Sequence, residues 1–303
     1  MKNLFTAGIT LLLLLLLTAC SGKEEAEQND KAAESATEKT EEVFKIGAIP
    51  DQNAADMNRS LSKLADYLSE KTDLKVEYVP SVDYAALVTA FERGEIQLAW
   101  FGGLTGVQAR NIVPDAEAIA QRPMDEEFHS VFIAGTNTNI KSLEDLKGQS
   151  FTFGSESSTS GHLMPRYFLE EAGINPEKDF DGQPNYSGSH DKTYKLVESG
   201  SMKAGVLNIS VWEAAVAENK VDTNKVDVFY TTPSYYDYHW TINVVDEKFG
   251  DGTKQKVTDA LLSINSTDQP EIMELFQSDT FIPTTNDNYK AIEQVAKEVG
   301  IIK

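Results

Sequence analysis

The chain has 303 residues, 41% of them hydrophobic, and its 48 acidic residues outnumber its 27 basic ones to give a formal net charge of -21. Such an acidic chain is not expected to bind nucleic acid, because phosphate contacts require clustered Lys and Arg. The single cysteine, Cys20, leaves no second thiol for a disulfide, so the fold must rely on its apolar core.

The first twenty residues are typical of a targeting segment. Lys2 gives a positive start, residues 9–17 are an apolar run, and Leu17-Thr18-Ala19-Cys20 resembles a bacterial lipobox, in which the cysteine thiol is acylated after cleavage. The apolar run is shorter than the ~20 residues of a membrane-spanning helix. We therefore expect residues 1–20 to be a lipoprotein signal peptide and the mature protein to be extracytoplasmic, anchored to the cell membrane by a lipidated Cys20. The alternative is an ordinary secretory signal with a chance cysteine.

Residues 21–42 have the composition of a tether. They contain eight acids, three lysines and no aromatic residue. A segment of this kind cannot bury enough apolar surface to offset its ordering entropy. We expect a disordered acidic linker.

From residue 43 onward, apolar runs typical of strands alternate with helical periodicity. Strands are expected at residues 44–49, 76–79, 96–101, 116–120 and 130–134, and helices at 54–71, around Leu87, Val88 and Phe91, and after the Gly102-Gly103 pair. Strands separated by helices of this length predict βαβ units and a parallel sheet.

The alternation restarts near residue 137. Strands are expected at 150–153, 185–187, 204–207, 226–230 and 240–245, and helices at 143–147, up to 172, 191–198, 211–219, 257–264 and 289–299. The length after residue 42 exceeds one comfortable core of ~100–200 residues. We expect an α/β protein with two lobes, residues 43–136 plus 240–303 and residues 137–239.

The hydroxyl-rich segment from Ser155 to His162 carries the clearest functional signal. It follows a strand and opens a helix, where free N–H groups and the helix dipole favour an anion. Gly161 would let the backbone approach a ligand closely. The alternative is an over-capped helix, because Ser and Thr are simply good caps.

Two further helix starts could serve the same ligand. Gly188-Ser189-His190-Asp191 offers a histidine, although Asp191 is more simply a cap, and Trp100-Phe101-Gly102-Gly103 lies on the opposite lobe, although one or both aromatics could belong to the core. Tyr84 and His129 are polar aromatics near predicted strand ends. The aromatic run of residues 231–240 predicts a linker or cleft rim between the lobes.

Metal, cofactor and catalytic sites find no support in the sequence. The four histidines lack ligand spacing, no cysteine is available, and the hydroxyl-rich segment matches neither a Walker A loop nor a nucleophile elbow. We expect no catalytic residue, no metal and no cofactor.

Together, Ser158-Thr159-Ser160-Gly161, Gly188-Ser189-His190 and Ala99-Trp100-Phe101-Gly102 resemble the phosphate/phosphite/phosphonate-binding family of ABC-importer proteins, over residues 44–303. The resemblance implies a two-lobed periplasmic-binding-protein (type II) fold with mixed, mainly parallel sheets and a ligand in the inter-lobe cleft. It implies that the ligand-binding residues are Tyr84, Trp100, Gly102, His129, Ser158, Thr159, Ser160, Gly161 and His190.

Two departures from that family bear on the ligand. A tyrosine expected before the strand at 130–133 is replaced by Phe128-His129, and residues 204–208 contain no acid, which argues against an aminoalkylphosphonate. The stretch from Trp100 to Arg110 resembles a sub-branch described as selenate-binding. A site made only of donors, with no carboxylate, would suit a fully deprotonated dianion.

The sequence thus predicts a binding protein, not an enzyme, that captures a small tetrahedral oxyanion, phosphonate/phosphite/phosphate-like or selenate, and delivers it to the permease subunits of an ABC importer. The alternatives are a secreted phosphoryl- or sulfuryl-ester hydrolase and an anion-sensing surface receptor.

Overall fold

The computed structural model describes residues 42–303, which form one compact unit. The expectations for the signal peptide, for Cys20 and for the tether up to residue 41 lie outside the described residues. Within the described part of the chain, no helix combines the length and the apolar character needed to cross a membrane.

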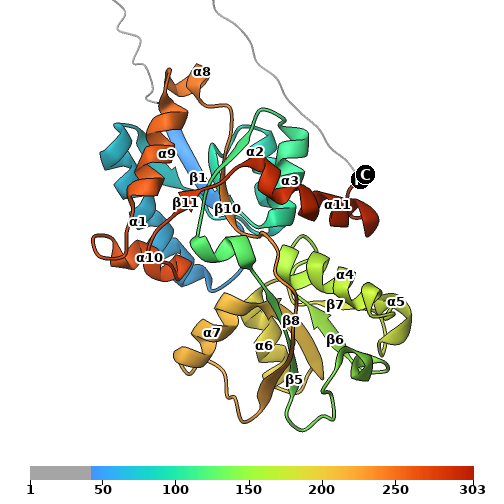
Figure 1. Ribbon diagram of the computed structural model, residues 1–303. Coiled ribbons are helices and arrows are strands. Elements are labelled where there is room, and N and C mark those ends of the chain that lie inside the picture. The colour runs from blue at the N-terminus through green and yellow to red at the C-terminus, as the bar shows by residue number, and fades with distance from the viewer. Residues whose placement is uncertain (1–41) are drawn as a thin grey trace, which may run out of the picture. The chain divides into compact units, whose positions relative to one another are not determined.

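The first of two sheets has six strands in the order β11-β4-β10-β3-β1-β2. Its strands are β1 (Val43–Ala48), β2 (Lys75–Tyr78), β3 (Leu98–Phe101), β4 (Glu117–Gln121), β10 (His239–Ile242) and β11 (Ile282–Pro283). Its helices are α1 (Ala54–Thr72), α2 (Tyr84–Glu92), α3 (Gly103–Ile112), α8 (Asp246–Phe249), α9 (Thr253–Ser263), α10 (Pro270–Phe276) and α11 (Lys290–Glu298). Figure 1 shows these helices packed around the sheet.

The second sheet has five strands in the order β7-β6-β8-β5-β9. Its strands are β5 (Ser130–Gly135), β6 (Phe151–Phe153), β7 (Asn185–Tyr186), β8 (Ala204–Asn208) and β9 (Val226–Thr231), and its helices are α4 (Met164–Glu171), α5 (Pro176–Asp179), α6 (His190–Glu198) and α7 (Ile209–Ala217). Short helical turns complete the chain: η1 (Pro123–Glu127), η2 (Leu143–Leu146), η3 (Thr159–Leu163) and η4 (Asn286–Tyr289).

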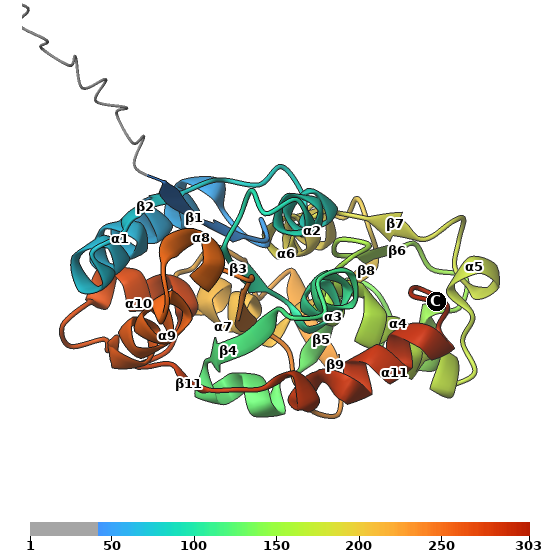
Figure 2. The ribbon, with the colours of Figure 1, turned by 90° about the horizontal axis from the view of Figure 1, so that it is seen from above.

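Helical periodicity explains how the longest helix packs. On α1, Leu61, Leu64 and Leu68 are fully buried at the i, i+3, i+7 spacing of one helix face. Asn53 caps the helix by accepting hydrogen bonds from the backbone N–H groups of Ala55 and Asp56. The buried face packs against α9 and α10, which return from the end of the chain to cover the same sheet (Figure 2).

The pairing of β5 corrects the expected lobe boundary. Ser130–Gly135 was assigned to the first lobe, but it pairs antiparallel with both β8 and β9 in the second sheet. The chain therefore crosses from the first lobe to the second before Ser130, not after residue 136. The strand is apolar on both faces, so its composition did not reveal which sheet it would enter.

The sheets are mixed, but they are not mainly parallel. Antiparallel pairings join β10 to β3 and β4, β11 to β4, and β5 to β8 and β9, whereas β1–β2, β1–β3, β6–β7 and β6–β8 are parallel. The reason is that β5 and β10 directly follow the two segments that cross between the lobes, which we call the first crossing segment (residues 122–129) and the second crossing segment (residues 232–238). Each strand enters its sheet without the helical crossover that a parallel neighbour requires.

Candidate functional site

The hydroxyl-rich loop after β6 has a defined internal structure. Ser158 Oγ accepts a hydrogen bond from the backbone N–H of Gly161 (2.9 Å), and Gly154 N–H donates to the carbonyl of Gly161 (2.8 Å). A Cβ on Gly161 would lie 2.9 Å from Ser158 Oγ and 3.1 Å from His190 Cε1. Only glycine therefore fits at this position. We call residues 158–161 the hydroxyl loop.

The hydroxyl loop meets the start of α3 on the first lobe. Leu104 N–H donates to Thr159 Oγ1 (2.9 Å), and Gly103 N–H donates to Asp237 Oδ1 (2.9 Å). A Cβ on Gly102 would lie 3.1 Å from Thr159 Oγ1 and 3.2 Å from Asp237 Oδ1, so the backbone here also approaches closely. The N-terminus of α3, where a partial positive charge resides, thus faces the loop and a carboxylate.

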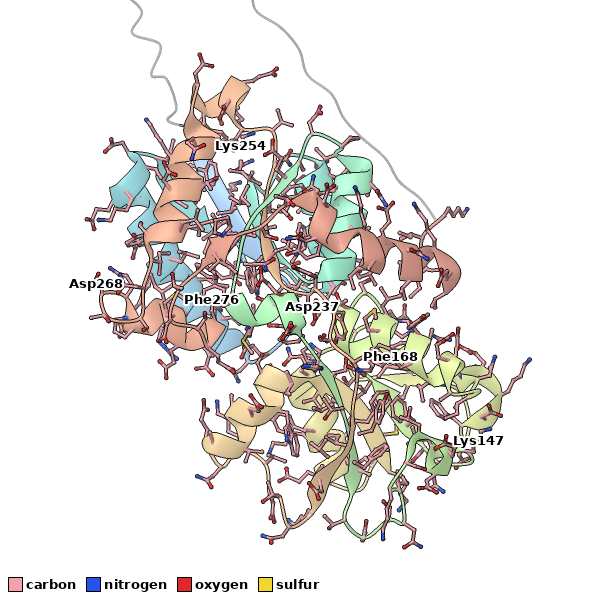
Figure 3. All side chains as sticks on the ribbon, in the orientation of Figure 1. Lys147, Phe168, Asp237, Lys254, Asp268 and Phe276 are labelled. Carbon is pink, nitrogen blue, oxygen red and sulfur yellow. The ribbon has the colours of Figure 1, made fainter. Side chains whose placement is uncertain are left out.

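Three fully buried polar atoms at this meeting point lack a hydrogen-bond partner within the described residues. They are Tyr84 Oη, Ser160 Oγ and Asp237 Oδ2. The Tyr84 hydroxyl lies beside Ser158, and the Asp237 carboxylate lies beside the Thr159 and Ser160 hydroxyls. Buried polar groups are normally paired, so these atoms are suited to a small polar ligand. In Figure 3, Asp237 lies between the elements of the two lobes.

His190 is already committed to a hydrogen-bond network. Asn208 N–H donates to Nδ1 (3.3 Å), which leaves the proton of the neutral ring on Nε2, within 3.2 Å of Tyr238 Oη. The same hydroxyl accepts from Asn208 Nδ2 (2.8 Å). The Tyr238 hydroxyl also lies beside the Asp51 carboxylate, whose pKa burial raises and this hydroxyl lowers in part. The network joins both lobes, and His190 N–H also donates to the Asp51 carbonyl (3.0 Å).

Burial controls the charge of these groups. It raises the pKa of Asp237 to about 7 and that of Asp51 to about 6, and it lowers the pKa of His190 to about 4. His190 is therefore neutral near neutral pH, while Asp237 can carry or release a proton. An anion at this point would be held by hydroxyl and N–H donors beside one titratable carboxyl group.

The structure brings most of the predicted site residues together. Tyr84, Gly102, the hydroxyl loop and His190 form, with Asp237, what we call the polar cluster. Their contacts with a ligand stay predictions.

Two of the expected residues lie elsewhere. Trp100 is 5% exposed and packs in the first core, stacked on Tyr238 at 5.7 Å between ring centroids and against Trp240 and Phe276. His129 lines a separate groove of about 890 Å³, and its Nδ1 hydrogen-bonds the Thr232 carbonyl (2.7 Å).

Asp237 was missed from the sequence, and it adds a carboxylate to the polar cluster, where a site made only of donors was expected. The absence of an acid at residues 204–208 was taken to mean a site without a carboxylate, but Asp237 supplies one from the second crossing segment. The sequence signal for Asp237 was a lone acid within the aromatic run of residues 231–240. That run was interpreted only as a linker or cleft rim. The run does connect the lobes, but it also enters the polar cluster.

Comparisons with known proteins find relatives over most of the chain. A family model described as the periplasmic substrate-binding protein of phosphonate ABC transporters matches residues 46–289. The chain is 41% identical over 271 residues to a probable ABC transporter phosphite-binding protein, PhnD1, of Prochlorococcus marinus, covering 86% of this chain and 91% of that protein. It is 31% identical over 201 residues to the phosphate-import protein PhnD of Mycolicibacterium smegmatis, covering 63% and 61% of the two chains.

Solved structures share the fold. The structure of Prochlorococcus marinus PhnD1 in complex with methylphosphonate matches with a TM-score of 0.82 and 40% identity, over 86% of this chain and 99% of that one. A binding-protein component of an ABC phosphonate transporter from Pseudomonas aeruginosa matches with a TM-score of 0.75 at 21% identity, over 84% and 85% of the two chains. This second likeness concerns the fold alone.

Proposed function

Because the chain belongs to the family of periplasmic substrate-binding proteins of phosphonate ABC transporters, we propose that it captures phosphite or a small phosphonate for its importer. Proteins of this family are extracytoplasmic and bind their substrate without transforming it, so the hydrolase alternative is set aside. The relative named for phosphite and the structural neighbour that holds methylphosphonate support this ligand class. No observation favours a separate sensing role.

The buried carboxyl group of Asp237 is the observation that carries the proposal. One of its oxygens accepts from Gly103 N–H, and the other has no partner among the described residues. Phosphite and phosphonates release their last proton near neutral pH, so a P–O–H group can donate to this free oxygen. The remaining ligand oxygens would accept from Tyr84 and the hydroxyl loop, which offer donors.

The same group argues against selenate, the alternative that the sequence left open. Selenate has no proton near neutral pH, so the ionised Asp237 would repel it, and the protonated form would donate to a weakly basic oxygen. In either protonation state, Asp237 therefore stabilises bound selenate less than it stabilises a bound phosphorus oxyanion. We infer that the site discriminates between the two through a proton shared by ligand and carboxylate.

The substituent on phosphorus is small. The lobes meet directly at the polar cluster, where the Leu104 N–H donates to Thr159 Oγ1, and a Cβ on Gly102 or Gly161 would lie 3.1 or 2.9 Å from its nearest neighbour. A long alkyl chain on phosphorus would hold the lobes apart, so this direct contact favours a small substituent.

Replacing the acceptor tests the proposal. Asp237→Asn keeps an oxygen for Gly103 N–H but presents an N–H to the ligand, so phosphite binding should weaken by about 1.5–3 kcal/mol. Selenate binding should stay equal or improve, so the ratio of phosphite affinity to selenate affinity should fall. Calorimetric titration of the full-length protein measures this ratio. Asp145→Asn, which removes the same charge from an exposed turn, is the control and should leave the ratio unchanged. An unchanged ratio in Asp237→Asn would refute the proposed contact.

We also propose that Cys20 carries the lipid anchor. The support is its position after the apolar run and its being the chain's only cysteine. Acyl chains contribute about 0.8 kcal/mol per buried CH2, which is enough for stable anchoring when two or more are attached. Cys20→Ser should move the protein from the membrane fraction to the soluble fraction after cell fractionation; retention in the membrane fraction would contradict the proposal.

A further inference from the structure

A buried ion pair lies where the two crossing segments pass between the lobes. Arg122 and Asp125 are 5% and 0% exposed, and the guanidinium donates to both carboxylate oxygens, Nε to Oδ2 and Nη2 to Oδ1, at 2.7 Å each. Arg122 Nη1 also donates to the carbonyl of Phe276 (3.0 Å). The first crossing segment is therefore tied to α10 of the first lobe.

Three aromatic rings enclose the guanidinium. Its central carbon lies 5.6, 5.4 and 5.0 Å from the ring centroids of Trp100, Phe128 and Tyr238. These rings come from β3, from the first crossing segment and from the second. The desolvation of a buried ion pair offsets most of its attraction, so this pair is weak support for stability alone. Its placement at the crossing indicates a different role.

The carboxylate end of the pair holds the second crossing segment. Asp125 Oδ1 accepts from Tyr238 N–H (3.3 Å), and the Asp125 carbonyl accepts from Asp237 N–H (3.2 Å). The side chain and the backbone of one residue thus fix the two neighbours that enter the polar cluster. Asp237 then reaches Gly103, and Tyr238 reaches His190.

We propose that Arg122 and Asp125 are positioning residues that hold the ligand acceptor Asp237 on the first lobe. This inference rests on the proposed function. Its consequence is that the site has two preassembled halves. Asp237 stays beside Tyr84 and the α3 N-terminus when the lobes separate, while the hydroxyl loop moves with the second lobe.

The direct test is Arg122→Lys in the full-length protein, because lysine keeps the charge but loses the two-pronged contact. We expect phosphite affinity to fall about tenfold and selenate affinity to change less than about threefold, since only phosphite depends on a fixed Asp237. Amide hydrogen exchange at Asp237 and Tyr238 should accelerate in the ligand-free variant. Asp125→Asn, which keeps the side-chain size, should change affinity and exchange in the same direction.

Leu64→Ala on α1 is the matched control for a purely structural effect. Leu64 is fully buried in the first core, so its truncation lowers stability, but it should alter neither the phosphite-to-selenate ratio nor exchange at Asp237. If Asp237→Asn weakens phosphite binding while Arg122→Lys and Asp125→Asn match the wild type in both readouts, the positioning inference alone is overturned. If the wild type does not bind phosphite, the proposed function fails, and the exchange comparison still decides whether the pair holds Asp237.

Discussion

At the residue scale, one titratable group dominates the behaviour of the site. Asp237 is fully buried, and burial raises its pKa to about 7, with a smaller contribution from the charge of Asp125. A carboxyl group in this range exchanges its proton with phosphorus oxyanions at little cost. The same burial makes the ionised form unfavourable when no ligand supplies a proton.

This group should make the ligand-free protein less stable as the pH rises. Between about pH 4 and 7 the folded state binds the Asp237 proton more tightly than the unfolded state does, so the stabilisation present below pH 4 is lost by about pH 7. Asp51 acts in the same direction up to about pH 6. His162 and His190, whose pKa values are lowered to about 4, act in the opposite direction between about pH 4 and 6.5.

Comparing Asp237→Asn with the wild type cancels the histidine contributions. We expect the free energy of unfolding of the variant to exceed that of the wild type by roughly 2–4 kcal/mol at pH 8. Each unit by which burial raises the Asp237 pKa costs the ionised folded wild type about 1.4 kcal/mol. At pH 4, where the wild-type carboxyl group is already neutral, the gain should vanish. Chemical denaturation at both pH values measures it, and an equal difference at pH 4 and pH 8 would contradict the raised pKa.

Local signals identified the hydroxyl loop, but not its carboxylate partner. Ser158 to Gly161 follow a strand and open a helix, which is a pattern within a few residues. Asp237 meets Gly103 across 134 positions of sequence, and no local pattern reports such a contact. Trp100 shows the converse, since an aromatic residue at a strand end is compatible with a ligand contact and with the core, and only packing decides.

At the scale of elements, the hydroxyl loop owes its form to an irregular helix start. Residues 159–163 form a single π-helical turn before α4, and the Leu163 N–H donates to the Ser158 carbonyl (3.0 Å). Such turns are often found at functional sites. The sequence predicted one helix up to residue 172, because helical periodicity does not distinguish a wider first turn from a regular one.

The close approach of Gly161 gives a prediction for this element. Gly161→Ala would place a methyl group 2.9 Å from Ser158 Oγ and 3.1 Å from His190 Cε1, so the loop must shift and phosphite affinity should fall about tenfold or more. Gly94→Ala is the control, because Gly94 has a φ of +66° in an open turn. That variant should lose stability, measured by thermal melting, but keep its affinity for phosphite, measured by titration. Equal affinities in the two variants would contradict the account of the loop.

Elements that enter a sheet from the other lobe were the least predictable. The positions of β5 and β10 in the sequence were expected, but β5 was assigned to the wrong sheet, because its pairing depends on where the chain crosses. The short elements α5, α8, α10 and β11 carry too few residues for a periodic signal. Long amphipathic helices such as α1 were predicted closely, because one buried face determines them.

At the scale of the whole described unit, both lobes contribute to the polar cluster. The first lobe contributes Tyr84 and the α3 N-terminus, the second contributes the hydroxyl loop and His190, and the second crossing segment contributes Asp237. Direct hydrogen bonds from Leu104 to Thr159 and from His190 to Asp51 join the lobes around it. A ligand that bridges the halves would favour this arrangement over separated lobes, as hinge closure in binding proteins requires.

The central claim is that this closed site selects a phosphorus oxyanion through a shared proton. Calorimetric titration of the wild-type protein at pH 7 with phosphite, methylphosphonate, selenate and sulfate tests it most directly. We predict that phosphite or methylphosphonate binds with a Kd at least about 100-fold lower than that of selenate or sulfate, a difference of about 2.7 kcal/mol. Selenate or sulfate binding as tightly as either phosphorus ligand would contradict the claim.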